Sequence, residues 1–119
     1  MNRFLKSFGY AWKGIRSVFE SEPNMKIHIS ITVLVVLFGI LFKISIYEWI
    51  AVVLSIGLVL TSEMFNTAVE TLADKISAEK DPLLGKTKDI AAGAVLISAI
   101  ISAVVGLIIF VPKVLVMIM

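Results

Sequence analysis

Three long apolar stretches alternate with polar segments along this chain, at residues 27–46, 49–73 and 90–112. Each is about 20 residues long or slightly longer, which is the length that an α-helix needs to cross a hydrocarbon core of about 30 Å. Backbone polar groups in lipid must be satisfied within their own element, so the stretches predict helices rather than strands. The pattern therefore predicts an all-α integral membrane protein with three transmembrane helices in a single domain over residues 1–119.

Residues 3–20 follow a different pattern, with apolar and basic side chains on opposite sides of a helical wheel. The apolar side carries Phe4, Phe8, Ala11, Trp12, Ile15 and Phe19, and the basic side carries Arg3, Lys6, Lys13 and Arg16. This is the pattern of an amphipathic helix at a membrane surface. Charges run through the whole segment, so it is not a signal peptide. Pro23 is expected to break the helix before the first span.

The links between the spans and the distribution of basic residues predict a topology. The short link 43–48 makes the first two spans an antiparallel hairpin, and segment 75–89, with Pro82 and Gly85, predicts a polar loop. Basic residues concentrate before the first span and in this loop, whereas the other ends of the spans carry only Lys43 and Lys113. By the positive-inside rule the N-terminus and the loop are cytoplasmic, and the C-terminus lies outside.

Composition supports the membrane prediction and excludes several functions. Hydrophobic residues make up 59% and charged residues 17% of the 119 residues, against roughly 45–50% and about 25% in soluble domains. A chain this short has too little interior for so many apolar side chains. The absence of cysteine excludes disulfides, cysteine-based zinc fingers and a thiol nucleophile. A net charge of +2 gives no reason to expect nucleic-acid binding.

The second span carries a stripe of polar residues, Glu63, Asn66, Thr67, Glu70 and Asp74. At 100° per residue they fall within an arc of about 100° on one helix face. Carboxylates at membrane depth are expensive and usually mark a functional site. A purely structural stripe joining helices is the alternative, although it would use more amides and hydroxyls than acids. The stripe predicts ligands for protons, a cationic substrate or a divalent metal.

The third span carries small residues on one face, which favours close helix packing in lipid. These are Ala92, Ala99, Ser102, Ala103 and Gly106. Three helices alone cannot enclose a polar site, so a homo-oligomer is expected. His28, the single histidine, is interpreted as an interfacial residue without a ligand role.

The segment before the third span contains Gly85-Lys86-Thr87, which copies the end of a phosphate-binding loop. The full motif needs glycine at position 80, where this chain has Lys80, and it needs a preceding strand. Thr87 is instead expected to cap the third span. Lys88 beside a helix N-terminus is a plausible phosphate contact, and Asp89 there would stabilise the helix dipole.

Taken in order, the motifs resemble those of the prokaryotic diacylglycerol kinase family over nearly the whole chain. The matching residues are Gly9-Tyr10-Ala11-Trp12-Lys13-Gly14-Ile15-Arg16, Glu22, Glu63-Met-Phe-Asn66-Thr-Ala-Val-Glu70 with Asp74, and Lys88-Asp89 with the residues to Ile97. The resemblance implies a homotrimeric bundle in the bacterial cytoplasmic membrane. It also implies transfer of the γ-phosphoryl group of ATP to a lipid hydroxyl.

The resemblance also implies a role for each matching residue. Glu63 would be the catalytic base on the lipid substrate, and Glu22 and Glu70 would hold Mg²⁺ on ATP. The further ATP-binding residues would be Arg3, Tyr10, Glu79, Lys80, Asp81, Lys88 and Asp89. Asn66 and Asp74 would be supporting polar residues. Phosphoryl transfer depends on positioning and charge neutralisation, which this set of side chains supplies.

The lipid substrate is predicted from three stretches that resemble the branch of the family acting on undecaprenol. These are residues 22–28, 46–49 and 110–113. Diacylglycerol is the alternative substrate, because both lipids present a primary hydroxyl at the interface. A small proton-coupled or cationic-drug transporter is the alternative from another class, but it has no use for Glu22 or for the Lys88-Asp89 pair. A pore-forming or scaffolding peptide explains neither cluster.

Overall fold

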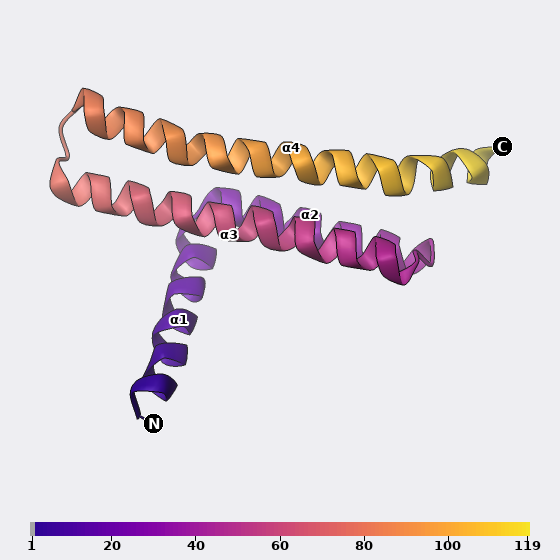
Figure 1. Ribbon diagram of the computed structural model, residues 1–119, viewed down its shortest axis with the longest axis horizontal. Helices are drawn as coiled ribbons and strands as arrows, with labels where there is room; N and C mark the ends of the chain where they lie inside the picture. The colour runs from indigo at the N-terminus through magenta and orange to yellow at the C-terminus, as the bar shows by residue number, and fades with distance from the viewer. Residues whose placement is uncertain (1) are drawn as a thin grey trace.

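A computed structural model describes residues 2–119 and is helical almost throughout this range (Figure 1). The helices are α1 (Asn2–Ser21), α2 (Pro23–Leu41), α3 (Ile46–Ile76) and α4 (Pro82–Ile118). Helices α2, α3 and α4 are each long and apolar enough to cross a membrane. Many of their large apolar side chains are exposed, as expected for helices that face lipid. The predicted all-α membrane fold with three spanning helices is confirmed.

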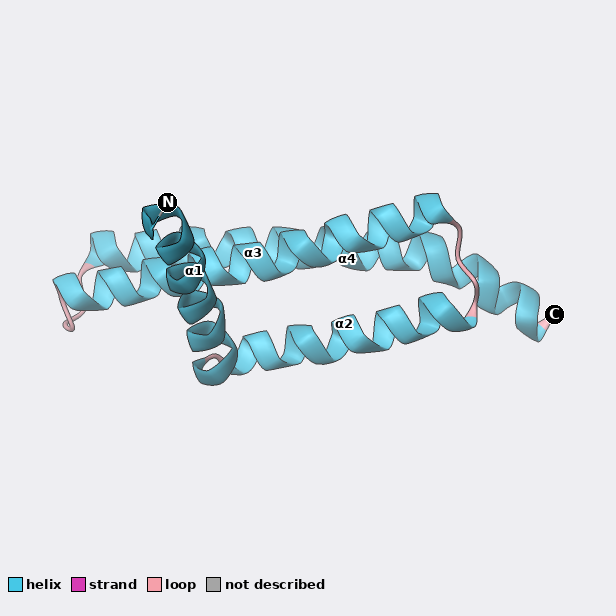
Figure 2. Ribbon diagram, turned by 90° about the horizontal axis from the view of Figure 1, so that it is seen from below, coloured by secondary structure: helices cyan, strands magenta, loops and turns pink. Residues whose placement is uncertain are grey.

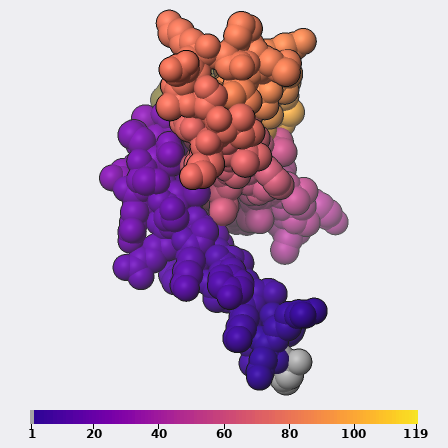
Figure 3. All heavy atoms as spheres, turned by 90° about the vertical axis from the view of Figure 1, so that its left-hand side faces the viewer, coloured from indigo at the N-terminus to yellow at the C-terminus, as the bar shows by residue number. Residues whose placement is uncertain are grey.

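Helices α3 and α4 run side by side along most of their length, and α2 lies along another side of α3, offset from the α3–α4 pair (Figures 1 and 2). Helix α1 leaves this bundle at a corner and projects away from it, as Figure 3 shows from the α3–α4 loop end. The corner follows from the sequence, because Glu22 is the N-cap of α2 and Pro23 occupies its first turn. Val18 and Met25, on either side of the corner, are buried.

The spanning helices differ in length, and the difference defines two ends of the molecule. Helix α2 has 19 residues, or about 28 Å, and matches the hydrocarbon core. Helices α3 and α4 have 31 and 37 residues, or about 46 and 55 Å. Their excess length extends beyond α1 at the α3–α4 loop end (Figure 1). This hairpin end therefore projects out of the hydrocarbon layer on the side where α1 joins.

The third span differs from the sequence prediction at both ends. The predicted loop over 75–89 is wrong from position 82 onward, because α4 begins at Pro82. Its N-cap is Asp81, whose carboxylate accepts hydrogen bonds from the backbone N–H groups of Leu83 and Leu84. Thr87 is not the cap, since its hydroxyl donates to the carbonyl of Leu83 within the helix, at 3.0 Å. The helix also continues through Pro112 to Ile118.

Polar contacts join α3 to α4 within the bilayer region. The hydroxyls of Ser62 and Ser98 lie 2.7 Å apart, and the Ser102 hydroxyl donates to the carbonyl of Ser55 at 3.1 Å. Ala99, Ser102, Ala103 and Gly106 of the predicted packing face line a cavity.

A second set of polar contacts fixes the opposite end of α3 and α4. Ser45 and Glu48 form a capping box at the start of α3. The other carboxylate oxygen of Glu48 lies 2.8 Å from the ammonium of Lys113 on α4. This ion pair joins the two helices directly after Pro112.

The close packing of the α2–α3 hairpin gives a stability prediction at Gly39. A Cβ atom added there would lie 2.7 Å from Cη2 of Trp49 and 3.2 Å from Cδ1 of Ile44. Gly39→Ala is expected to destabilise the protein by about 1–3 kcal/mol through overpacking, measured as a lower thermal unfolding temperature in detergent. Gly57→Ala is the control, because nothing lies within 4 Å of its added Cβ. Equal unfolding temperatures for the two variants would contradict this packing.

The polar end of α3 as the candidate functional site

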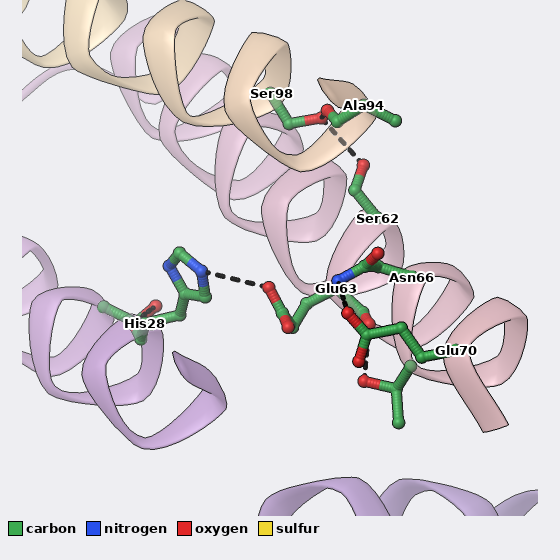
Figure 4. Close-up of polar contacts among 9 residues, drawn as sticks. His28, Ser62, Glu63, Asn66, Glu70, Ala94 and Ser98 are labelled. Atoms are coloured by element: carbon green, nitrogen blue, oxygen red, sulfur yellow. Dashed lines mark hydrogen bonds and ion pairs between the residues drawn. The ribbon is translucent and has the colours of Figure 1, made fainter. Parts of the chain in front are cut away.

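Glu63 is the most deeply buried carboxylate of the polar stripe, with 1% of its surface exposed. It lies 17 residues after Ile46, or about 26 Å along α3, which places it near one boundary of the hydrocarbon core. Its carboxylate points toward α2, where Oε2 lies 3.5 Å from Nε2 of His28 (Figure 4). The stripe therefore begins at the membrane boundary and continues outward along the hairpin.

His28 lies in the candidate site, a position that its sequence context does not predict. The sequence favours an isolated interfacial residue, whereas the structure places His28 against Glu63 with 18% of its side chain exposed. The second turn of α2 holds it there, and the Thr32 hydroxyl donates to its backbone carbonyl at 2.8 Å. The imidazole also lines the cavity between the spanning helices.

Asn66 and Glu70 form the next part of the stripe. The Asn66 amide donates to Oε1 of Glu70 at 3.5 Å, and Asn66 is 7% exposed (Figure 4). Within the described residues, Oδ1 of Asn66 and Oε2 of Glu63 are buried and have no hydrogen-bond partner. Buried polar atoms are normally satisfied. Oδ1 of Asn66 can therefore accept a hydrogen bond from a bound group, and Oε2 of Glu63 faces the imidazole of His28.

Lys88 and Asp74 meet at the end of the site nearest the α3–α4 loop, where they form an ion pair between α3 and α4. The sequence predicts Lys88 as a phosphate contact and Asp74 as a supporting residue, but not their contact with each other. Both side chains are more than one-third exposed, so the pair faces solvent and an anion can reach the ammonium. Asp89, the neighbour of Lys88, is exposed on α4.

The α3–α4 loop and Lys88 line a shallow groove of about 440 Å³. Glu79, Lys80 and Asp81 are exposed along it. Asp81 has a structural role as the α4 cap in addition to its expected place at the nucleotide.

Arg3 and Tyr10 lie apart from this groove within one chain. Both are exposed on α1, which projects away from the other helices (Figures 1 and 3). Lys13 places its ammonium 5.8 Å from the Tyr10 ring centroid, a cation–π contact within α1. Glu22 lies at the α1–α2 corner, and its side chain makes no capping hydrogen bond.

The donor set fits Mg²⁺. The stripe and the corner offer carboxylate and amide oxygens, which are the ligands that this hard cation prefers. The described residues contain no cluster of three or more metal-ligating side chains. Mg²⁺ nevertheless needs only one or two carboxylates when substrate phosphates complete its coordination. The carboxylate of Glu22, unused in capping, and that of Glu70, held only by a long hydrogen bond, suit this arrangement.

An apolar cavity of about 290 Å³ lies between α2, α3 and α4. His28 and Thr32 line it from α2, Val52 and Val59 line it from α3, and Gly106 lines it from α4. The cavity thus begins at His28, which contacts Glu63, and extends toward the opposite membrane boundary. It presents an apolar surface with His28 at one end.

The fold and the site define a small multi-pass membrane protein with a carboxylate-rich site where its spanning helices leave the bilayer. The sequence profile of the prokaryotic diacylglycerol kinase family matches residues 9–110, and the chain belongs to this family. The resemblance predicted from the motifs is therefore confirmed, and family membership identifies the protein as a lipid kinase.

Individual relatives support the same assignment. The undecaprenol kinase of Bacillus subtilis (strain 168) is 42% identical over 113 residues, covering 95% of this chain and 92% of that protein. The diacylglycerol kinase of Escherichia coli (strain K12) is 29% identical over 102 residues, covering 86% and 84%. The diacylglycerol kinase of Synechocystis is 36% identical over 103 residues, covering 86% of this chain and 59% of that protein.

Proposed function

We propose that this protein phosphorylates undecaprenol with ATP and Mg²⁺ at the cytoplasmic face of the bacterial cell membrane. The observation that carries the proposal is the buried carboxylate of Glu63 beside His28, which lines one end of an apolar cavity. A lipid alcohol needs an apolar surface for its chain and a polar group for its hydroxyl, and this arrangement offers both. The identity to a relative named undecaprenol kinase favours this lipid over diacylglycerol.

In this proposal Glu63 is the general base. Its carboxylate takes the proton of the lipid hydroxyl as the hydroxyl oxygen attacks the γ-phosphorus of ATP. A new P–O bond forms to the lipid, the bond from the γ-phosphorus to the bridging oxygen breaks, and ADP leaves with that oxygen. The base lies at the membrane boundary, where a lipid hydroxyl can meet a nucleotide in water.

The remaining site residues bind and orient ATP. Mg²⁺ would be held by Glu22 and Glu70, and when bound it supplies charge neutralisation on the phosphates. Asn66, which donates to Glu70, would orient that carboxylate. Lys88 would contact the phosphates by exchanging Asp74 for a phosphate oxygen, and Asp74 keeps the ammonium in place until then. The loop residues Glu79, Lys80 and Asp81, together with Asp89, would line the nucleotide groove.

A homotrimer would complete the nucleotide site. Arg3 and Tyr10 project away from the groove within one chain. We therefore expect them to contact the nucleotide site of a neighbouring subunit. The apolar side of α1 would lie on the membrane surface and keep both residues at the height of the phosphates. This arrangement requires a cytoplasmic N-terminus and an outer C-terminus, in agreement with the distribution of basic residues.

Substrate competition tests the proposed lipid. Undecaprenol and diacylglycerol at equal mole fractions in mixed micelles with labelled ATP are expected to give undecaprenyl phosphate as the dominant product. The long isoprenoid chain can follow the apolar cavity along the bundle, so its binding is expected to be favoured. Dominant formation of phosphatidic acid would assign the protein to diacylglycerol phosphorylation. Movement of cations across a membrane without lipid phosphorylation would support the transporter alternative.

A further inference from the structure

The carboxylate of Glu63 is buried, and one of its oxygens lacks a hydrogen-bond partner. Oε2 has no hydrogen-bond partner within the described residues. A buried polar group without a partner costs about 1–3 kcal/mol, and a charged one costs more. The neighbouring donors do not relieve it, because Asn66 donates to Glu70 and the Thr67 hydroxyl donates to the backbone carbonyl of Glu63. His28 is the side chain placed against this oxygen, at 3.5 Å.

We propose that His28 is a positioning residue for Glu63. Its Nε2–H group donates to Oε2 of Glu63, fixes the rotamer of the carboxylate and leaves Oε1 to receive the proton of the lipid hydroxyl. Either the neutral Nε2–H tautomer or the imidazolium ion supplies this donor. The inference rests on the proposed role of Glu63 as the base.

The contact length fits a pair that tightens during turnover. A separation of 3.5 Å exceeds the usual 2.7–3.2 Å of an N–H···O hydrogen bond. Catalytic hydrogen bonds are often long without substrate and shorten in the reactive complex. His28 also lines the apolar cavity, so a lipid that fills the cavity contacts the imidazole directly. Substrate binding can thereby press the imidazole onto the carboxylate that it orients.

The His28–Glu63 pair links α2 to α3 at the site end of the bundle. His28 lies five residues after Pro23 on α2, about 8 Å inside the end of that helix. Glu63 lies on α3, and the two helices are held together at their far end by the packing of Gly39 against Trp49. The His28–Glu63 contact is therefore the polar link between α2 and α3 at the site end. It joins the base to the helix that also begins at Glu22.

Kinetics of the full-length protein in mixed micelles test the proposal. His28→Leu removes the donor and is expected to lower kcat by about 10–100-fold, as loss of an orienting partner typically does, with little change in the KM for ATP. His28→Gln retains an N–H donor on a side chain of similar reach and is expected to recover most of that loss. Ser30→Ala, on an exposed position of α2 whose hydroxyl bonds only to the Lys26 carbonyl, is the matched control. Wild-type kcat in His28→Leu would overturn the proposal.

A double-mutant cycle separates positioning from a general packing role. If His28 acts through Glu63, adding His28→Leu to Glu63→Gln is expected to produce little further loss of kcat, because the base is already absent. A role in packing alone would reduce the rate by the same factor in both backgrounds. Full additivity of the two losses would therefore contradict the proposal.

The single histidine of the chain gives a spectroscopic readout that does not depend on activity. The ¹⁵N resonances of the imidazole in the wild-type protein are expected to show a protonated Nε2, and Glu63→Gln is expected to shift them. Unchanged resonances would overturn the contact even if His28→Leu failed to fold. Failure of the wild-type protein to phosphorylate any lipid alcohol would instead refute the proposed function, while the resonance shift would still report on the pair.

Discussion

Glu63→Gln is expected to reduce kcat by about 10²–10⁴-fold, the usual effect of losing a general base. The amide keeps the shape of the side chain within its buried site, so packing against α2 is retained. It cannot accept the proton of the lipid hydroxyl at neutral pH. The proposed nucleotide groove is lined by the α3–α4 loop and Lys88 and does not include Glu63, so the KM for ATP is expected to change little. Steady-state kinetics with saturating lipid measure both values.

The matched control for this substitution is Glu20→Gln. Glu20 is an exposed carboxylate on α1 that pairs with Arg16 at 2.8 Å, and its loss is expected to leave turnover unchanged. Because both variants remove one negative charge, the comparison isolates the position of Glu63 from a general charge effect. Near-normal turnover in Glu63→Gln would remove Glu63 from the role of base.

The membrane fold could be predicted from the sequence because lipid imposes strong rules on the chain. Apolar stretches of spanning length and their charged flanks identify the spanning helices without tertiary information. The corner at Pro23 was also predictable, because proline ends one helix and begins another. These features depend on local composition, which a sequence displays directly.

The start of α4 was not predictable by the same rules. Segment 82–89 contains Pro82 and Gly85 and several charges, which are typical of a loop. Proline is nevertheless favourable in the first helical turn, and Asp81 immediately before it is a strong N-cap. The capping pattern is present in the sequence, but the polarity of the segment favours a loop. A helix that extends beyond the bilayer can be polar at its end.

The His28–Glu63 contact was missed because it depends on the register between two helices. His28 lies 17 residues before Ser45, and Glu63 lies 17 residues after Ile46, so an antiparallel hairpin centred between Ser45 and Ile46 places them at one height. That symmetry was available once the hairpin was predicted. Which faces of the helices meet, however, depends on rotations set by packing, such as Trp49 against Gly39. The composition of either helix alone does not reveal this.

The expected site residues divide into groups according to what the fold brings together. The structure joins Asn66 with Glu70 and joins Lys88 with Asp74. It leaves Arg3 and Tyr10 on a helix that points away from the groove (Figure 1). The Asn66–Glu70 and Lys88–Asp74 pairs follow from helical spacing and from the α3–α4 hairpin. Both of these features can be predicted from local sequence. The contacts of Arg3 and Tyr10 would be made between subunits, which the sequence of one chain does not specify.

Removal of Mg²⁺ is expected to have a large effect, because ATP phosphates would then carry their full charge into a site lined by carboxylates. Excess EDTA is expected to abolish lipid phosphorylation, and added Mg²⁺ should restore it. Loss of several kcal/mol of charge stabilisation corresponds to a rate decrease of at least about 10²-fold. Activity that persists in EDTA would contradict a Mg²⁺-dependent mechanism for this protein.

Single substitutions then test whether Glu22 and Glu70 share one ion. Each replaced by Ala is expected to raise the Mg²⁺ concentration for half-maximal activity by about 10-fold or more, because each would remove one of the protein's two carboxylate ligands. Glu20→Ala, two residues from Glu22 but exposed and paired with Arg16, is the control and should leave the Mg²⁺ titration unchanged. Glu70 lies on α3 and Glu22 lies at the α1–α2 corner, so parallel responses would support a common ligand that joins the two elements. A response from Glu70→Ala alone would assign Glu22 to the helix corner and leave Glu70 with the ion.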